Sequence, residues 1–156
     1  MKKLFVTNTK YLTKDLGLLV ARIAVAILML LHGLPKLEML LSDGPVQFPA
    51  VLGMSAELSL GLAVFAEVVC SVLILVGLGT RMASVPLMVT MLVAIFSFHA
   101  NDVFAQKELA VLYLAAYVVL FVAGSGKYSM DQWLQPKRRV RYHSFDIQDP
   151  TLTVYQ

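Results

Sequence analysis

The chain has 156 residues, 58% of them hydrophobic and 15% charged, with a formal net charge of +3 and a mean hydropathy of +0.74. This apolar content excludes an ordinary soluble globule, because too little polar sequence remains to cover the core. The length allows one domain.

Four apolar segments follow one another along the chain: 16–34, 58–78, 82–98 and 109–123. A helix needs about 20 residues to cross the hydrocarbon core, and the fourth segment reaches that length when its flanking residues extend it. Backbone groups inside a bilayer must be satisfied within helices. We therefore predict an all-α membrane protein, an antiparallel bundle of four transmembrane helices over residues 16–131. A segment 1–15 precedes the bundle, and a polar tail 132–156 follows it.

The basic residues predict the orientation of this bundle. Ten of the thirteen lysines and arginines lie before the first segment, between the second and third, or after the fourth. By the positive-inside bias, the N-terminus and the C-terminus are both cytoplasmic. The charge then faces anionic headgroups, so the lipid bilayer is the expected partner and nucleic acid is not.

Two charges lie inside the predicted spans. Glu67 is near the middle of the second segment, where a carboxylate costs several kcal/mol unless it is protonated, paired or beside water. Arg22 lies near the same depth in the first segment, so we predict a buried Arg22–Glu67 charge pair. The pair could serve only to set the helix register, and an unpaired Glu67 would instead be protonated and available for proton exchange. Pro35 predicts that the first helix kinks or ends near its position.

Other polar side chains gather at the outer end of the bundle. His32, Lys36, His99 and Glu108 are predicted to line an outward pocket, where histidines and carboxylates can exchange protons with a bound carbonyl compound. Tyr113 is either a wall of this pocket for a planar, quinone-like ligand or a core residue. The spacing fits no metal-binding motif, so we predict no metal site.

At the opposite end, Arg81 and Asp131 belong to a predicted cytoplasmic turn in which Asp131 either caps the emerging chain or pairs with Arg81. Ser55, Ser59 and Ala63 recur every four residues on the second segment. Small residues at this spacing permit close helix contact, within the bundle or between protomers of a homo-oligomer.

The chain resembles the DoxX family of small four-span bacterial membrane proteins. The resemblance covers roughly residues 16–133 and is carried by these stretches: Ala21-Arg22, Leu31-His32-Gly33 with Lys36, Glu67 with 75–81, His99, and the ending Gly124-Ser125-Gly126-Lys127-Tyr128-Ser129-Met130-Asp131. It implies a multi-pass protein of the bacterial cytoplasmic (inner) membrane. Some members are linked to quinone-coupled oxidation or to membrane-bound oxidoreductase assemblies, so the resemblance also implies a role in redox chemistry.

The sequence contains no cofactor site of its own that we recognise: Cys70 is the only cysteine, and there is no glycine-rich nucleotide loop or matched pair of haem ligands. The first hypothesis is therefore an accessory or quinone-interacting subunit of a membrane oxidoreductase system, working with a redox partner protein. The alternatives are a small-solute or proton-coupled carrier, for which a midplane carboxylate is typical, and a structural membrane organiser without chemistry.

Overall fold

The computed structural model describes residues 11–134, and its regular structure over this range is entirely helical. Residues 1–10 and 135–156 lie outside the described residues, so most of the predicted N-terminal segment and polar tail lies there too. The helical segments are α1 (Tyr11–Leu41), α2 (Ala56–Val64), η2 (Phe65–Cys70), α3 (Ser71–Val76), α4 (Thr80–Val93), η3 (Ala94–Phe98), α5 (Phe104–Ala123) and α6 (Met130–Leu134).

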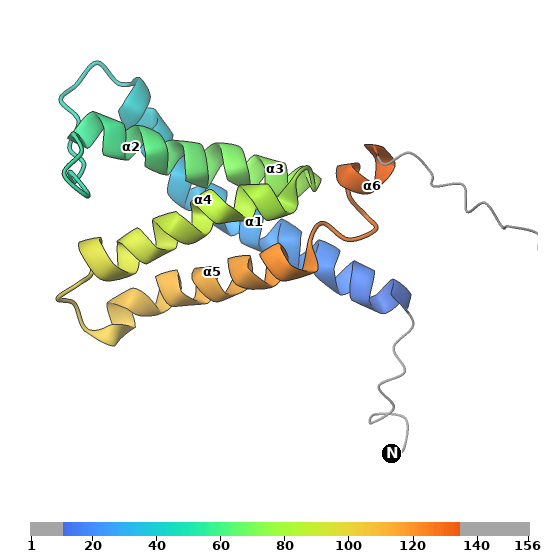
Figure 1. The fold of residues 1–156 in the computed structure, drawn as a ribbon. Helices are drawn as coiled ribbons and strands as arrows, with labels where there is room; N and C mark the ends of the chain where they lie inside the picture. Colours follow the sequence, from blue (N-terminus) through green and yellow to red (C-terminus); the bar gives the residue numbers. More distant parts are fainter. Residues whose placement is uncertain (1–10, 135–156) are drawn as a thin grey trace, which may run out of the picture.

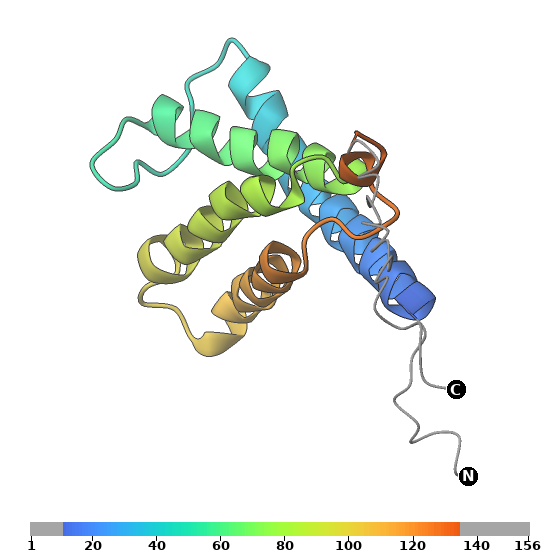
Figure 2. The ribbon, with the colours of Figure 1, turned by 45° about the vertical axis from the view of Figure 1, so that its right-hand side comes forward.

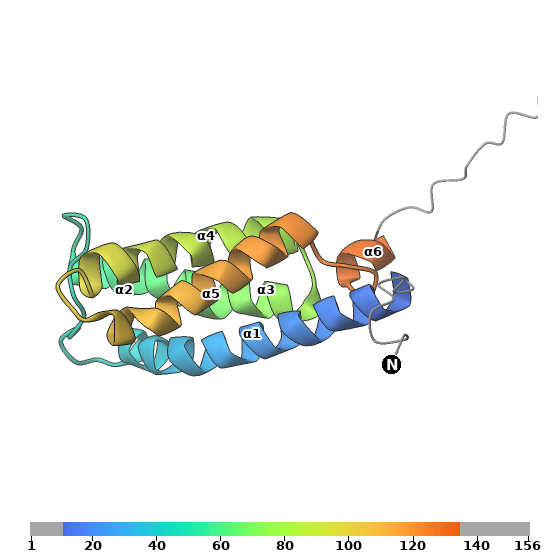
Figure 3. The same cartoon turned by 90° about the horizontal axis from the view of Figure 1, so that it is seen from below.

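The four predicted spans are confirmed as helices long and apolar enough to cross a membrane. They are Lys14–Leu41, Ala56–Val76, Thr80–Phe98 and Phe104–Ala123. The second span is built from α2, η2 and α3, and the third from α4 and η3. Figure 3 shows the spans running lengthwise along the bundle, with α1 packed along the second span and α4 along α5, and Figure 1 shows α1 crossing the α4–α5 pair obliquely.

The two ends of the bundle differ. One end, here called the loop end, holds the connections 42–55 and 99–103; the other, the terminal end, holds the turn between α3 and α4 and the short helix α6 (Figure 2). Which end faces the cytoplasm remains a prediction from the basic residues.

Helix α1 does not end at Pro35 but continues to Leu41. A proline inside a helix removes one backbone donor, which membrane helices tolerate when neighbouring helices and side chains satisfy the freed group. The consequence for function is that Lys36 belongs to a packed helix and not to an outer loop.

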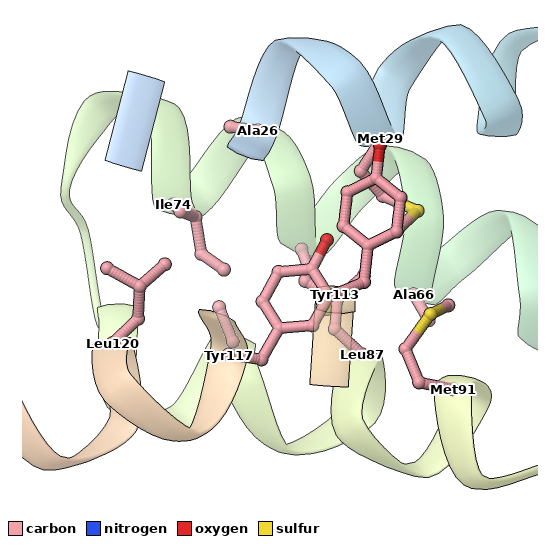
Figure 4. Packing of buried hydrophobic residues seen from close by; sticks show 11 residues of the cluster. Ala26, Met29, Ala66, Ile74, Leu87, Met91, Tyr113, Tyr117 and Leu120 are labelled. Carbon is pink, nitrogen blue, oxygen red and sulfur yellow. The ribbon is translucent and has the colours of Figure 1, made fainter. Parts of the chain in front are cut away.

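The core is a cluster of buried side chains contributed by all four spans. Tyr117, Leu87 and Ile74 lie fully buried at its centre, and Figure 4 shows Tyr117 and Tyr113 pointing from α5 into the bundle interior. Large apolar residues such as Leu31 and Val119 are exposed on the outside of the bundle. An apolar exterior of this kind suits a lipid environment.

The connection 42–55 is fixed to the bundle by two serines. The Ser55 side chain caps α2 by accepting a hydrogen bond from the Leu58 amide at 3.2 Å, and the Ser59 hydroxyl accepts one from the Val51 amide at 3.1 Å. The second bond ties the segment just before α2 onto its buried face. This segment is thereby held at the loop end, where it closes part of a pocket described below.

Candidate functional site

A buried ion pair joins α1 to the second span, with partners that differ from those predicted. The Lys36 ammonium donates to Glu67 Oε1. The Glu67 side chain is 3% exposed and that of Lys36 29% exposed, so the carboxylate is enclosed while the lysine reaches it from the loop end. The predicted Arg22–Glu67 pair is therefore wrong, although both residues are buried.

The helix register explains this correction. A Cβ atom on Gly33 would lie 3.0 Å from Glu67 Cβ, and one on Gly77 would lie 2.5 Å from Arg22 Nη1, so Gly33 lies beside Glu67 and Arg22 beside Gly77. Gly33 follows Arg22 by eleven positions on α1, which corresponds to about 16 Å along the helix axis. Because Glu67 lies beside Gly33, Arg22 and Glu67 are separated by about this distance along the bundle. Lys36 lies within one turn of Gly33 and on a nearby face, which places its long side chain within reach of the carboxylate.

Glu67 lies in η2, a π-helical segment in the middle of the second span. Short π-helical insertions are frequent at functional sites. A second such segment, η3, ends the third span, and its residues Ala94 and Phe98 line the same pocket as Glu67. Both π-helical segments of the described chain thus adjoin one cavity.

This cavity lies at the loop end between the spans and has a volume of about 560 Å³. Most of its wall is apolar, and segment 48–54 contributes Phe48, Pro49, Val51, Leu52 and Met54 to it. The polar side chains that reach it are His32, Lys36, Ser59, Glu67, Thr90, His99, Gln106 and Tyr113. A mostly apolar cavity of this size with a few converging polar groups is typical of small-molecule sites.

Four of the five predicted pocket residues line this cavity: His32, Lys36, His99 and Tyr113. Glu108 does not, and it is exposed. The reason is the helix period, since the lining positions of α5 fall on one face (106, 109, 110 and 113) and residue 108 projects from the other. Prediction from sequence missed that Glu67 belongs to the pocket, because it had assigned Glu67 to the bundle core.

Aromatic and imidazole rings follow one another from the pocket into the core. His32 meets Tyr113 edge to face with ring centroids 5.9 Å apart, and Tyr113 stacks on Tyr117 at 6.1 Å. Tyr113 therefore satisfies both predicted alternatives, as a pocket wall and as a core residue. His99 lies nearer the loops, where its Nδ1 is 2.7 Å from a carboxylate oxygen of Asp102.

Arg22 stabilises the terminal end. Its guanidinium donates to the backbone carbonyls of Ser125 and, at 2.7 Å, of Tyr128. These carbonyls belong to the segment between α5 and α6, which runs across the terminal end of the bundle (Figure 1). The hydrogen-bond acceptors of the buried Arg22 side chain are thus main-chain oxygens more than one hundred residues away in the sequence.

The predicted turn formed by Arg81 and Asp131 is a capping arrangement and not an ion pair. Both carboxylate oxygens of Asp131 accept from the Gly79 amide, at 2.9 and 3.0 Å, and the Asp131 amide donates to the Gly77 carbonyl at 3.1 Å. Arg81 donates instead to the Val122 carbonyl at 3.1 Å. The segment ending at Asp131 therefore locks the turn that joins the second and third spans.

Within residues 11–134, no three histidine, cysteine or acidic side chains come together in a way that could hold a metal ion. The side chains of the pocket supply a cationic donor, a buried carboxylate, imidazoles and a phenol.

The fold and the pocket define a small multi-pass membrane protein whose four helices enclose a mostly apolar cavity with a buried ion pair. The family model for DoxX matches residues 17–100, more than half of the chain, and the chain belongs to the DoxX family. The match includes Arg22, Lys36 and Glu67, and it ends before the segment that closes the terminal end. No curated protein and no solved structure matches the chain.

Proposed function

We propose that the cavity binds a quinone and that the protein is an accessory, quinone-interacting subunit of a membrane oxidoreductase system in the bacterial inner membrane. The observation that carries this proposal is the cavity itself, about 560 Å³ in volume and apolar except for a few groups that include the Lys36–Glu67 pair. A quinone head group is an apolar ring with carbonyl acceptors, and an apolar tail gives it access from the bilayer.

The polar groups of the cavity match the hydrogen bonds that such a ring needs. Lys36 supplies N–H donors deep in the cavity, and His99 supplies a ring nitrogen near the loops. Tyr113 and Phe98 add aromatic surface against which a planar ring can lie. Under this proposal the electrons come from a cofactor held by a redox partner protein, and the chain supplies the binding site and its proton-carrying groups.

Purification from native membranes in a mild detergent, followed by mass spectrometry of the extracted lipids, tests the proposal. Two alanine-to-phenylalanine variants of α5 make a matched pair: Ala110 lines the cavity, and Ala115 is exposed on the outside of the same helix. Wild type and Ala115→Phe should retain quinone, whereas Ala110→Phe should retain at least about tenfold less because the added ring occupies the cavity.

Size-exclusion profiles and melting temperatures of both variants establish that they are folded. Wild-type protein that carries no quinone and binds none on addition would refute the proposal, as would equal retention by two folded variants.

One observation favours a second function, the proton-coupled carrier. A carboxylate near the middle of a span, placed in a π-helical break and paired with a cation, is an arrangement that transporters use. Uptake by proteoliposomes loaded with a pH-sensitive dye tests this. Solute-driven proton entry that is lost in Glu67→Gln would support the carrier, and the same entry in Glu67→Gln would exclude it.

A further inference from the structure

The Lys36–Glu67 pair leaves hydrogen-bonding capacity unused inside the cavity. Glu67 Oε1 accepts from Lys36, but Glu67 Oε2 is buried and has no hydrogen-bond partner within the described residues. An ammonium carries three N–H bonds, and the bond to Glu67 uses one of those of Lys36. Both residues line the cavity.

A carboxylate oxygen of this kind accepts hydrogen bonds and donates none. A buried acceptor without a partner is unfavourable, and it becomes satisfied only when an O–H or N–H group approaches. The terminal torsion of a glutamate is broad, so either oxygen can turn toward the cavity while the other keeps its contact with Lys36.

We propose that Lys36 and Glu67 together form a subsite for a hydroxyl group of the ligand. The hydroxyl oxygen accepts from the Lys36 ammonium, and the hydroxyl hydrogen is donated to the free oxygen of Glu67. This inference rests on the proposed function and makes it more specific. A quinol satisfies both residues, whereas a quinone carbonyl accepts from Lys36 and offers nothing to Glu67, so the cavity selects the reduced form.

The other polar groups of the cavity do not make this distinction. His32, Ser59, Thr90, His99, Gln106 and Tyr113 can each donate as well as accept, so they serve a carbonyl or a hydroxyl equally. Glu67 differs because it is an acceptor in its ionised state and is almost fully enclosed. The preference for a hydroxyl therefore resides in Glu67.

Anaerobic binding measurements on the purified full chain test the inference, with decylbenzoquinone, its quinol and the dimethyl ether of that quinol as probes. Wild type should bind the quinol about 10- to 100-fold more tightly than the quinone, the gain expected of one hydrogen bond to a charged group. The dimethyl ether, which has no O–H, should bind no better than the quinone. This comparison needs no variant, so it holds even if a change at Glu67 impairs folding.

Variants then locate the preference. Glu67→Gln should reduce it to less than about threefold, since an amide offers a donor as readily as an acceptor. Glu57→Gln, which alters an exposed glutamate outside the cavity lining, should retain it. Tyr117 carries another buried hydroxyl without a partner, and Tyr117→Phe should also leave the preference unchanged.

Equal affinities for quinol and quinone in wild type would overturn the hydroxyl subsite and leave the proposed function standing. A preference that appears only in Tyr117→Phe would also overturn it, because Tyr117 would then be the natural donor to Glu67. Failure of all three probes to bind would refute the proposed function and this inference with it.

Discussion

Replacing Lys36 with methionine tests the ion pair, because it leaves the Glu67 carboxylate in an enclosed site without its cation. Removing one partner of a buried pair costs about 3–5 kcal/mol when the remaining charge stays ionised. Lys36→Met should therefore lower the free energy of unfolding by about 3–5 kcal/mol.

For a chain of this size the loss corresponds to a fall in melting temperature of roughly 6–20 °C. Thermal unfolding in detergent measures it.

Lys107→Met is the matched control, since Lys107 donates to the Ala100 carbonyl and its loss strands no buried carboxylate. Its effect should be small. A deficit of Lys36→Met no larger than that of Lys107→Met would refute the reasoning. The double variant Lys36→Met, Glu67→Met should recover most of the lost stability, because replacing a whole buried pair by apolar groups is often neutral.

The same thermal assay checks three further expectations about close contacts. Gly33→Ala should lower the free energy of unfolding by about 1–2 kcal/mol, because its methyl group would lie 2.8 Å from a side-chain carbon of η2. Gly61→Ala, with open space around it, should be neutral or gain up to about 1 kcal/mol. Equal effects of the two changes would contradict the close approach of α1 to η2. Gly79→Ala, at φ +58° in open space, should lower the free energy of unfolding by about 1–2 kcal/mol. Gly77→Ala, at φ +74° with its methyl group 2.5 Å from Arg22, should destabilise far more. The reverse order would contradict the placement of Arg22. Arg22→Lys should lose roughly 1–3 kcal/mol although the charge is kept, because one ammonium does not reproduce the fork of donors that meets two carbonyls, and wild-type stability would exclude that role.

The four spans and their antiparallel packing were predictable because lipid imposes length, helicity and apolar composition on a sequence. The pocket residues at the loop end were largely predictable too, since histidines and a lysine at neighbouring span ends must lie close together in a bundle. Glu108 failed this test because nearness to a span end does not tell which face of the helix a residue occupies.

The partners of the buried charges could not be predicted, for two physical reasons. The predicted depth of Arg22 rests on a first segment of 16–34, and the continuation of α1 to Leu41 shifts its register against the second span. The acceptors of Arg22 are main-chain carbonyls, which every residue possesses, so no side-chain pattern marks them. One sequence feature does point to these contacts, the unusual ending from Gly124 to Asp131. Carbonyls of this segment accept hydrogen bonds from Arg22, and its aspartate accepts one from the Gly79 amide.

The bundle thus separates two kinds of paired charge, Arg22 and Glu67 lying about 16 Å apart along it. At the terminal end, Arg22 and Asp131 are each matched to backbone groups, and both gain hydrogen bonds from the folded chain itself. At the loop end, Glu67 has one oxygen paired and one unpaired, beside a cavity, in a segment whose helix is already interrupted. A charge that served only to fix helix register would gain stability from full pairing, as Asp131 does with both of its carboxylate oxygens. Arg22 pairs two of its three nitrogens, and its unpaired Nε lies away from the cavity that Glu67 lines. Glu67 leaves one oxygen unpaired beside a cavity in which a ligand can supply the missing donor, and this contrast is the physical reason for assigning recognition to Glu67 and assembly to Arg22.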